Sequence, residues 1–122
     1  MFATEYETND FPPLSSLHNH EAPCAVCRVT DRGTMLMIPA KTECPSGWTE
    51  EYQGYLMGGY HDHLSSKESI CVDENAEARP DSSTGNEDGA LLYPIEARCD
   101  NGNLPCRPYI NGDELACVVC TI

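Results

Sequence analysis

ACVVCTI, residues 116–122, combines β-branched residues with two cysteines, a composition typical of a buried strand. We predict that a strand covers residues 114–122. Cys117 and Cys120 are three positions apart, so on a strand their side chains point to opposite faces. Their Cα atoms would lie about 10 Å apart, whereas a disulfide requires roughly 7 Å or less. We therefore expect each cysteine to bond to a partner of its own, one on either side of the strand.

A similar phrase, PCAVCRV, occupies residues 23–29, so the chain carries the same two-cysteine signature twice. The other cysteines are Cys44, Cys71, Cys99 and Cys106. Cys99 and Cys106 flank the turn-forming stretch DNGNLP, and we predict that they bond to each other. The C-terminal pair then takes Cys44 and Cys71, in an order that the spacing leaves open.

Eight cysteines in a chain of 122 residues favour disulfides and an oxidising compartment. The first ten residues, MFATEYETND, contain neither the basic nor the apolar region of a signal peptide. We interpret the chain as a piece of a secreted protein whose upstream part is missing. Three other uses of the cysteines stay open: reduced thiols in the cytosol, a redox-active CxxC, and a zinc site built from the two signatures.

The composition indicates an all-β protein with many turns and a modest core. The chain has nine glycines, nine prolines and few aromatic residues, and no stretch keeps a helical apolar period. The net charge is −13, which disfavours binding to nucleic acid or to anionic membranes. No apolar run is long enough to predict a membrane span.

Four short strands are predicted, over residues 34–38, 50–57, 90–97 and 114–122. Pro94 should place the third of these at a sheet edge or a bulge. Asn111-Gly112 predicts a tight turn just before the last strand. We expect residues 1–23, which are polar and turn-rich, to be loosely ordered. The acidic stretch over residues 71–91 is predicted to be a surface loop, because loops of that length are usually functional or disordered.

CAVC at residues 24–27, followed by CPSGW at residues 44–48 and an aromatic-Gly-Tyr segment, resembles the C-terminal non-collagenous domain of type IV collagen. The phrases YLMGGY, DGALLYP and PYINGDELACVVC are still more similar to the short-chain, spongin-type collagens of sponges and other marine invertebrates. The type IV domain consists of two homologous halves, each closing with Cys-x-Val-Cys. The resemblance implies that residues 34–122 are one complete half, and that residues 1–33 are the tail of the preceding half plus a linker.

The resemblance further implies a small, disulfide-rich antiparallel β module. The three bonds that it implies are Cys44–Cys120, Cys71–Cys117 and Cys99–Cys106. It leaves Cys24 and Cys27 without partners. As a function it implies a non-catalytic structural module of the extracellular matrix, which is secreted and assembles with copies of itself and with matrix proteins. The chain contains no Gly-x-y repeat, so assembly through a collagen triple helix is not inferred.

Two groups of residues could hold a metal ion. Oxygen ligands for calcium are offered by Asp73, Glu77, Asn86 and Asp88, without the spacing of an EF-hand. His61 and His63 are two positions apart, as are His18 and His20, so each pair would share one face of a strand and could bind zinc. Solvated side chains in surface loops are the more ordinary explanation of both groups. We therefore expect no firm cofactor and keep calcium as the candidate.

The aromatic residues around the CPSGW phrase are Trp48, Tyr52, Tyr55 and Tyr60. We expect them to pack around a Cys44–Cys120 disulfide, and the alternative is an exposed aromatic face that binds sugar or protein. A cysteine-hydrolase set of Asp62, His63 and Cys24 or Cys27 has no supporting geometry, so we expect no enzyme. The alternative function is a secreted recognition module that binds glycan or a microbial surface, with calcium.

Overall fold

The computed structural model describes residues 3–64, 68–82, 84–101 and 104–122, which form strands, turns and almost no helix. The strands are β1 (Thr4–Tyr6), β2 (Met35–Pro39), β3 (Thr49–Gly58), β4 (Ser69–Asp73), β5 (Ala90–Pro94) and β6 (Ala116–Thr121). One short 3₁₀ helix, η1, covers Pro12–Leu17. Within the described ranges, no helix has the length and apolar character needed to cross a membrane. The chain is a small all-β domain.

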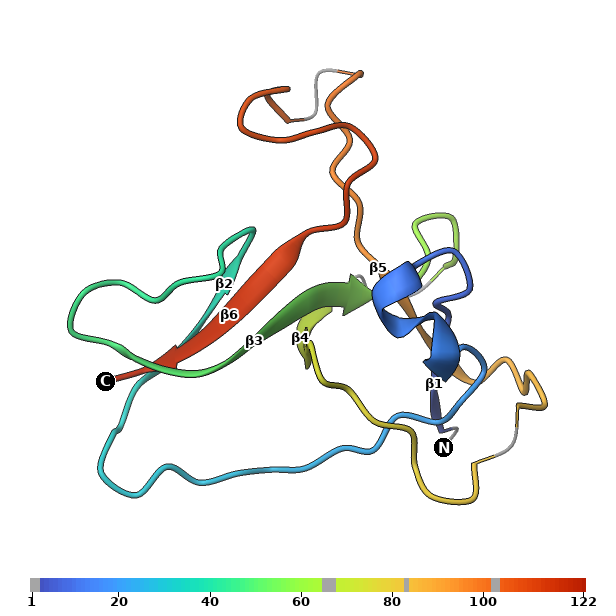
Figure 1. Cartoon of the computed structure of the whole chain (residues 1–122), viewed down its shortest axis with the longest axis horizontal. Helices are drawn as coiled ribbons and strands as arrows, with labels where there is room; N and C mark the ends of the chain where they lie inside the picture. The colour runs from blue at the N-terminus through green and yellow to red at the C-terminus, as the bar shows by residue number, and fades with distance from the viewer. Residues whose placement is uncertain (1–2, 65–67, 83, 102–103) are drawn as a thin grey trace.

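The six strands form one open sheet in the order β1-β5-β3-β6-β2, and β4 pairs with β3 outside this order (Figure 1). β3 is the centre of the sheet, with β4, β5 and β6 as its antiparallel partners. β6 lies between β3 and β2 and is antiparallel to both. The C-terminal strand therefore has a hydrogen-bonded neighbour on each side, which places it inside the sheet.

The four predicted strands are present as β2, β3, β5 and β6, while β1 and β4 were not predicted. We expected a purely antiparallel sheet, and this expectation is wrong for one pair of strands. β1 pairs with β5 in parallel, with Glu5 opposite Leu91. Parallel neighbours require a long connection. The chain between β1 and β5 includes β2, β3 and β4, so it is long enough to connect two parallel strands.

The N-terminal segment takes part in the fold, so the expectation of a loosely ordered stretch over residues 1–23 is wrong for the residues described. A buried cluster consists of Tyr6, Phe11, Leu14, Met57 and Val72. The ring of Phe11 meets that of Tyr55 edge to face, with the ring centroids 4.7 Å apart. The buried hydroxyl of Thr8 donates a hydrogen bond to the Leu14 carbonyl at 2.8 Å. The residues of the N-terminal segment that pack here are isolated apolar residues among polar neighbours. They show no periodic pattern from which the packing could be predicted.

A second buried cluster lies on the other face of β3 and β4 and consists of Leu56, Cys71, Cys117 and Val119. Adjacent residues of a strand point to opposite faces. Leu56 and Met57 accordingly belong to different clusters, as do Cys71 and Val72. β6 is buried on both faces from Cys117 through Thr121. Two small clusters in place of one large core agree with the modest apolar content of the sequence.

The acidic loop after β4 is bonded to the N-terminal segment. The Arg79 amide donates to the Glu21 carbonyl at 2.8 Å, and the Arg79 guanidinium pairs with the Glu21 carboxylate, also at 2.8 Å. Further along the loop, the amide of Glu87 donates to the carboxylate of the buried Glu5 at 3.1 Å. The loop thus lies against β1, which the sequence analysis did not predict.

Pro94 is the last residue of β5, and β5 lies between β1 and β3. The expectation that Pro94 places this strand at an edge or a bulge is therefore wrong. β5 pairs with β3 only at Met57↔Pro94 and Gly58↔Tyr93, so a proline at the strand end removes little of the ladder. The register irregularity of the sheet falls in β3 instead, between Glu50 and Tyr52.

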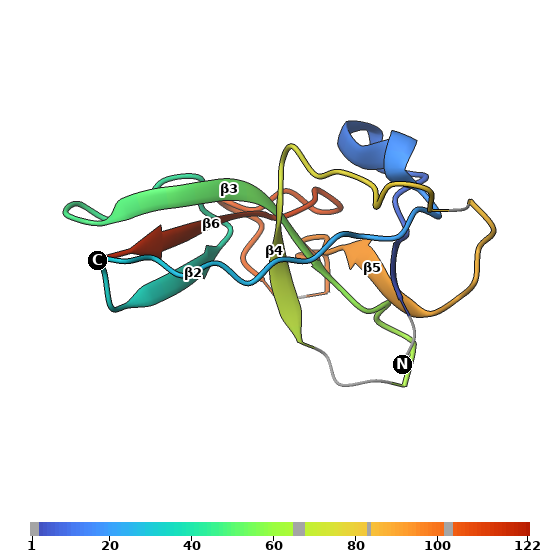
Figure 2. The same cartoon turned by 90° about the horizontal axis from the view of Figure 1, so that it is seen from below.

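β4 pairs with the second half of β3 (Figure 2), and the two backbones come unusually close at Gly54. A Cβ atom at Gly54 would lie 1.8 Å from the carbonyl oxygen of Val72, so only glycine leaves room for the β4 backbone. In a flat sheet, strands on either side of a common neighbour lie roughly 9.5 Å apart. The Cα atoms of Cys71 in β4 and Cys117 in β6 are nevertheless 5.7 Å apart. The sheet is therefore sharply bent where β4 and β6 flank β3.

Candidate functional site

Two disulfides hold β6 to distant parts of the chain. Cys120 bonds to Cys44, in the loop before β3, with a Cα–Cα distance of 5.9 Å and a sequence separation of 76. Cys117 bonds to Cys71 of β4, with a sequence separation of 46. Each cysteine of the C-terminal pair thus has its own partner, as an extended strand requires. β6 is fixed by covalent bonds as well as by hydrogen bonds on both edges.

The third disulfide, Cys99–Cys106, closes a local loop with a sequence separation of 7. The three pairs coincide with those that the type IV resemblance implies. Asn111-Gly112 forms the turn expected before β6, and the amide of Gly112 donates to the Ala97 carbonyl at 2.8 Å. Cys24 and Cys27 are free and exposed.

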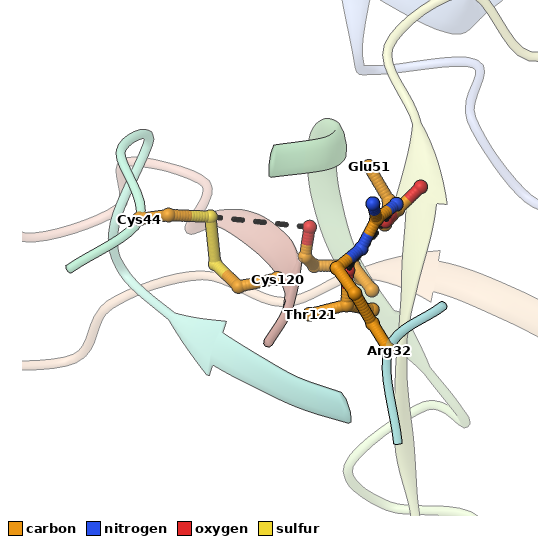
Figure 3. Close-up of a disulfide and its surroundings, with 6 residues drawn as sticks. Arg32, Cys44, Glu51, Cys120 and Thr121 are labelled. Carbon is orange, nitrogen blue, oxygen red and sulfur yellow. Dashed lines mark hydrogen bonds and ion pairs between the residues drawn. A yellow bond between two sulfur atoms is a disulfide. The ribbon is translucent and has the colours of Figure 1, made fainter. Parts of the chain in front are cut away.

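An ion pair and a hydrogen-bonded threonine lie beside the Cys44–Cys120 disulfide (Figure 3). The guanidinium of Arg32 donates to the carboxylate of Glu51 at 2.6 Å and to the hydroxyl of Thr121 at 2.6 Å. The Thr121 hydroxyl in turn donates to the same Glu51 oxygen. Arg32, which precedes β2, and Glu51, which lies in β3, are in this way both joined to the distant C-terminal end of β6.

The hydrogen bonds from Thr121 and Arg32 lower the pKa of the exposed Glu51 carboxyl below its ordinary value of 4.5. A carboxyl whose pKa is lower in the folded state contributes stability above its unfolded pKa and loses that contribution as the pH falls through the folded pKa. We expect Glu51→Gln to lower the free energy of unfolding at neutral pH. The difference from wild type should shrink as the pH falls below 4.5. Urea unfolding across an acidic pH series measures it.

Glu50→Gln is the matched control for this prediction, because Glu50 is the adjacent exposed residue and its replacement removes the same charge. Its difference from wild type should vary less with pH than that of Glu51→Gln. Equal pH profiles for the two variants would show that net charge, and not the contacts with Thr121 and Arg32, accounts for the effect.

The four aromatic residues of the predicted face do not come together. Tyr52 packs with the second buried cluster and Tyr55 with the first, on opposite faces of the sheet. Trp48 is half-buried in the turn after Cys44, and Tyr60 is exposed beyond the end of β3. A strand of alternating faces separates residues three positions apart, so one common aromatic surface around Cys44–Cys120 does not form.

Tyr60 belongs to a different aromatic group, with Tyr93 of β5 and the histidines of the predicted zinc pair. Its ring centroid lies 5.1 Å from that of Tyr93, 4.4 Å from that of His61 and 5.1 Å from that of His63. Burial, followed by the nearby Glu7, raises the pKa of the Tyr93 hydroxyl. His61 also lies 3.4 Å from the carboxylate of its neighbour Asp62. Both predicted zinc ligands therefore pack against the ring of Tyr60 at a tilted angle.

The residues suggested for calcium are not gathered into a site. Among the residues that the structure describes, no three His, Cys, Asp or Glu side chains form a group that could hold a metal ion. Asp73 accepts a hydrogen bond from the amide of Asn75 at 2.8 Å and so closes the turn after β4. Asp88 instead lies near Glu7, whose pKa is raised chiefly by burial and further by Asp88. Asp73 and Asp88, at the two ends of the acidic loop, therefore lie in different parts of the structure and do not form one site.

A groove of about 550 Å³ lies between the N-terminal segment and β4 with its following turn. Tyr6, Tyr52 and Cys24 are among the residues that line it. The Tyr6 hydroxyl donates to the Glu77 carbonyl at 3.2 Å, and that of Tyr52 donates to the Cys71 carbonyl at 3.0 Å. Burial raises the pKa of both hydroxyls, and the nearby Cys24 raises them further. Sequence reasoning missed this groove because its walls come from segments with no common motif.

The fold and its covalent bonds define the class of this protein: a small all-β domain whose C-terminal strand is tied to the rest of the sheet by two long-range disulfides. No family model matches the chain, and no solved structure matches it.

Proposed function

We propose that the chain is a non-catalytic assembly module of an extracellular matrix protein, related to the non-collagenous domains of short-chain collagens. The observation that carries the proposal is the pair of disulfides that fix β6 from both faces. Structural disulfides persist in oxidising compartments such as the extracellular space. They also stabilise a small domain whose apolar core would otherwise be marginal.

Exposed apolar residues at the open edge of the sheet support self-assembly. β2 has β6 on one side only, and its residues Met35 and Leu36 are exposed. Ile122, which follows β6 and bonds through its backbone to Thr34, is exposed as well. A sheet edge with unpaired backbone groups and apolar side chains is a surface on which another strand can pair. The proposed partner of this edge is a second copy of the chain.

Size-exclusion chromatography with light scattering tests the proposal. The free thiols are first blocked with iodoacetamide, so that only non-covalent association is measured. We expect oligomers that persist in a chelator, since no metal is part of the proposed contact. Met35→Ser/Leu36→Ser should shift the chain toward monomer. Ile110→Ser, at an exposed apolar residue away from the β2 edge, is the matched control and should leave the oligomer unchanged.

A chain that stays monomeric at every concentration would contradict the assembly function. A monomer that binds glycan only when calcium is present would instead favour a recognition module. Oligomers that dissociate equally in the Met35→Ser/Leu36→Ser and Ile110→Ser variants would place the contact away from β2.

A further inference from the structure

The two free cysteines lie on a single exposed segment. All eight cysteines fall within the described ranges, and six of them are bonded within the chain. Cys24 and Cys27 remain, on a segment without secondary structure over residues 23–32, which we call the strap. The strap runs along most of the length of the molecule, from near β1 to the C-terminal end of β6 (Figures 1 and 2).

The strap is attached mainly at its two ends. Before it, the amide of Ala22 donates to the Thr4 carbonyl at 2.8 Å, and after it the amide of Gly33 donates to the Ile122 carbonyl at 3.2 Å. Between these two anchors, no backbone hydrogen bond joins the strap to any residue that the structure describes. The side chain of Val26, between the two cysteines, is fully exposed. A segment with so few contacts can open locally at little cost.

The extended strap keeps Cys24 and Cys27 apart. At about 3.3 Å per residue, two extended residues three positions apart have Cα atoms about 10 Å from each other, beyond the reach of a disulfide. The same geometry gives Cys117 and Cys120 separate partners in β6. Each strap thiol therefore needs a partner outside the strap of its own copy. Because the other six cysteines of residues 1–122 are already bonded, the thiols that two copies of these residues can offer each other are those of their straps.

Charge also favours contact at the strap. The strap contains two basic residues, Arg28 and Arg32, against one acidic residue, Asp31, and Arg32 is paired with Glu51. The whole chain carries a net charge of −13, so two copies repel each other over most of their surfaces. A contact through the strap meets fewer carboxylates than the average surface of the chain, although Asp73 and Glu77 line the groove beside Cys24. Salt, which screens the remaining repulsion, should make the contact easier.

We propose that the strap is a covalent self-association site, at which Cys24 or Cys27 of one copy forms a disulfide with Cys24 or Cys27 of a second copy. The inference rests on the proposed assembly function for its biological setting. A low-molecular-weight disulfide, such as oxidised glutathione, is the oxidant. A strap thiolate attacks it and releases one small thiol, and a strap thiolate of the second copy then displaces the other. Two protein thiols become one interchain disulfide, and the small disulfide becomes two thiols.

Incubation of the purified, internally disulfide-bonded chain with oxidised glutathione tests the proposal. We expect a covalent dimer on non-reducing electrophoresis, and peptide mapping should find a disulfide that joins Cys24 or Cys27 of one copy to Cys24 or Cys27 of the other. The dimer should be lost in Cys24→Ser/Cys27→Ser. Because both cysteines are exposed and contribute to no internal bond, this variant should fold like the wild type, which its circular dichroism and melting curve verify.

The control adds Ser16→Cys to the Cys24→Ser/Cys27→Ser variant, because Ser16 is exposed on η1 and lies outside the strap. It should give much less covalent dimer than the wild type, and equal yields would overturn a specific role for the strap. The proposal is also overturned if the oxidised wild type remains monomeric, with Cys24 bonded to Cys27 or to glutathione. Dimers that persist without both strap cysteines would overturn it as well. The thiol-blocked oligomer described above is unaffected by these outcomes, so the two proposals fail separately.

Discussion

Replacing Cys71 and Cys117 together by alanine is expected to lower the free energy of unfolding by about 4 kcal/mol, because the bond closes a loop with a sequence separation of 46. In the chain-entropy model, a disulfide stabilises a protein by restricting its unfolded state, and longer loops contribute more. Small domains are stable by only about 5–15 kcal/mol, so this loss is a large part of the total. Urea unfolding followed by circular dichroism measures it.

Cys99→Ala/Cys106→Ala is the matched control for this variant. Its loop has a sequence separation of only 7, so the same model gives about 2.5 kcal/mol. We therefore expect the two double variants to rank in this order. If both variants lost the same stability, or if the loss of Cys71–Cys117 cost less than that of the short loop, β6 would not depend on its covalent attachment to β4.

Gly54→Ala is expected to destabilise the domain by about 3 kcal/mol or more. The new Cβ atom would lie 1.8 Å from the carbonyl oxygen of Val72 and 2.8 Å from the amide nitrogen of Glu74. Both are backbone atoms, so no side-chain rotation can relieve the overlap. β4 must move away from β3, and this movement takes Cys71 away from Cys117. Thermal unfolding measures the loss of stability.

A thiol titration and a control variant also test this prediction. Thiol titration of the variant should find additional free cysteines, because the Cys71–Cys117 bond no longer closes. Gly33→Ala is the control, since a Cβ atom at Gly33 meets nothing within 4 Å. We expect Gly33→Ala to leave the melting temperature nearly unchanged. A Gly54→Ala variant with wild-type stability and no extra thiols would show that the close approach of the β3 and β4 backbones is not required.

How far the sequence predicts the fold is best judged on particular strands. β6 was predictable because its β-branched residues and its two cysteines all favour an extended, buried conformation. β2, β3 and β5 were also found from their local composition. β1 was not, because its three residues are too few to show a period, and β4 was not, because it runs into the acidic stretch that was assigned to a loop. Both strands depend on partners that are distant in the chain.

Some features of the candidate site could likewise be predicted from the sequence, and others could not. The sequence indicated that Cys117 and Cys120 take separate partners, because the rise per residue of a strand is fixed whatever surrounds it. It did not indicate the groove around Tyr6 and Tyr52, which requires two segments about fifty residues apart to meet. It also placed Trp48, Tyr52, Tyr55 and Tyr60 together as a set, while the alternation of β3 separates them.

Strand propensity, turn residues and cysteine spacing act locally, so an all-β chain whose last strand is held by disulfides could be predicted from the amino acids alone. Three features became known only from the folded chain: the polar N-terminal segment joins the sheet, β4 lies tightly against β3 at Gly54, and the strap carries the two free thiols across the surface. These features depend on contacts between remote residues. Such contacts are fixed by the packing of the whole chain and leave no pattern in any one stretch of it.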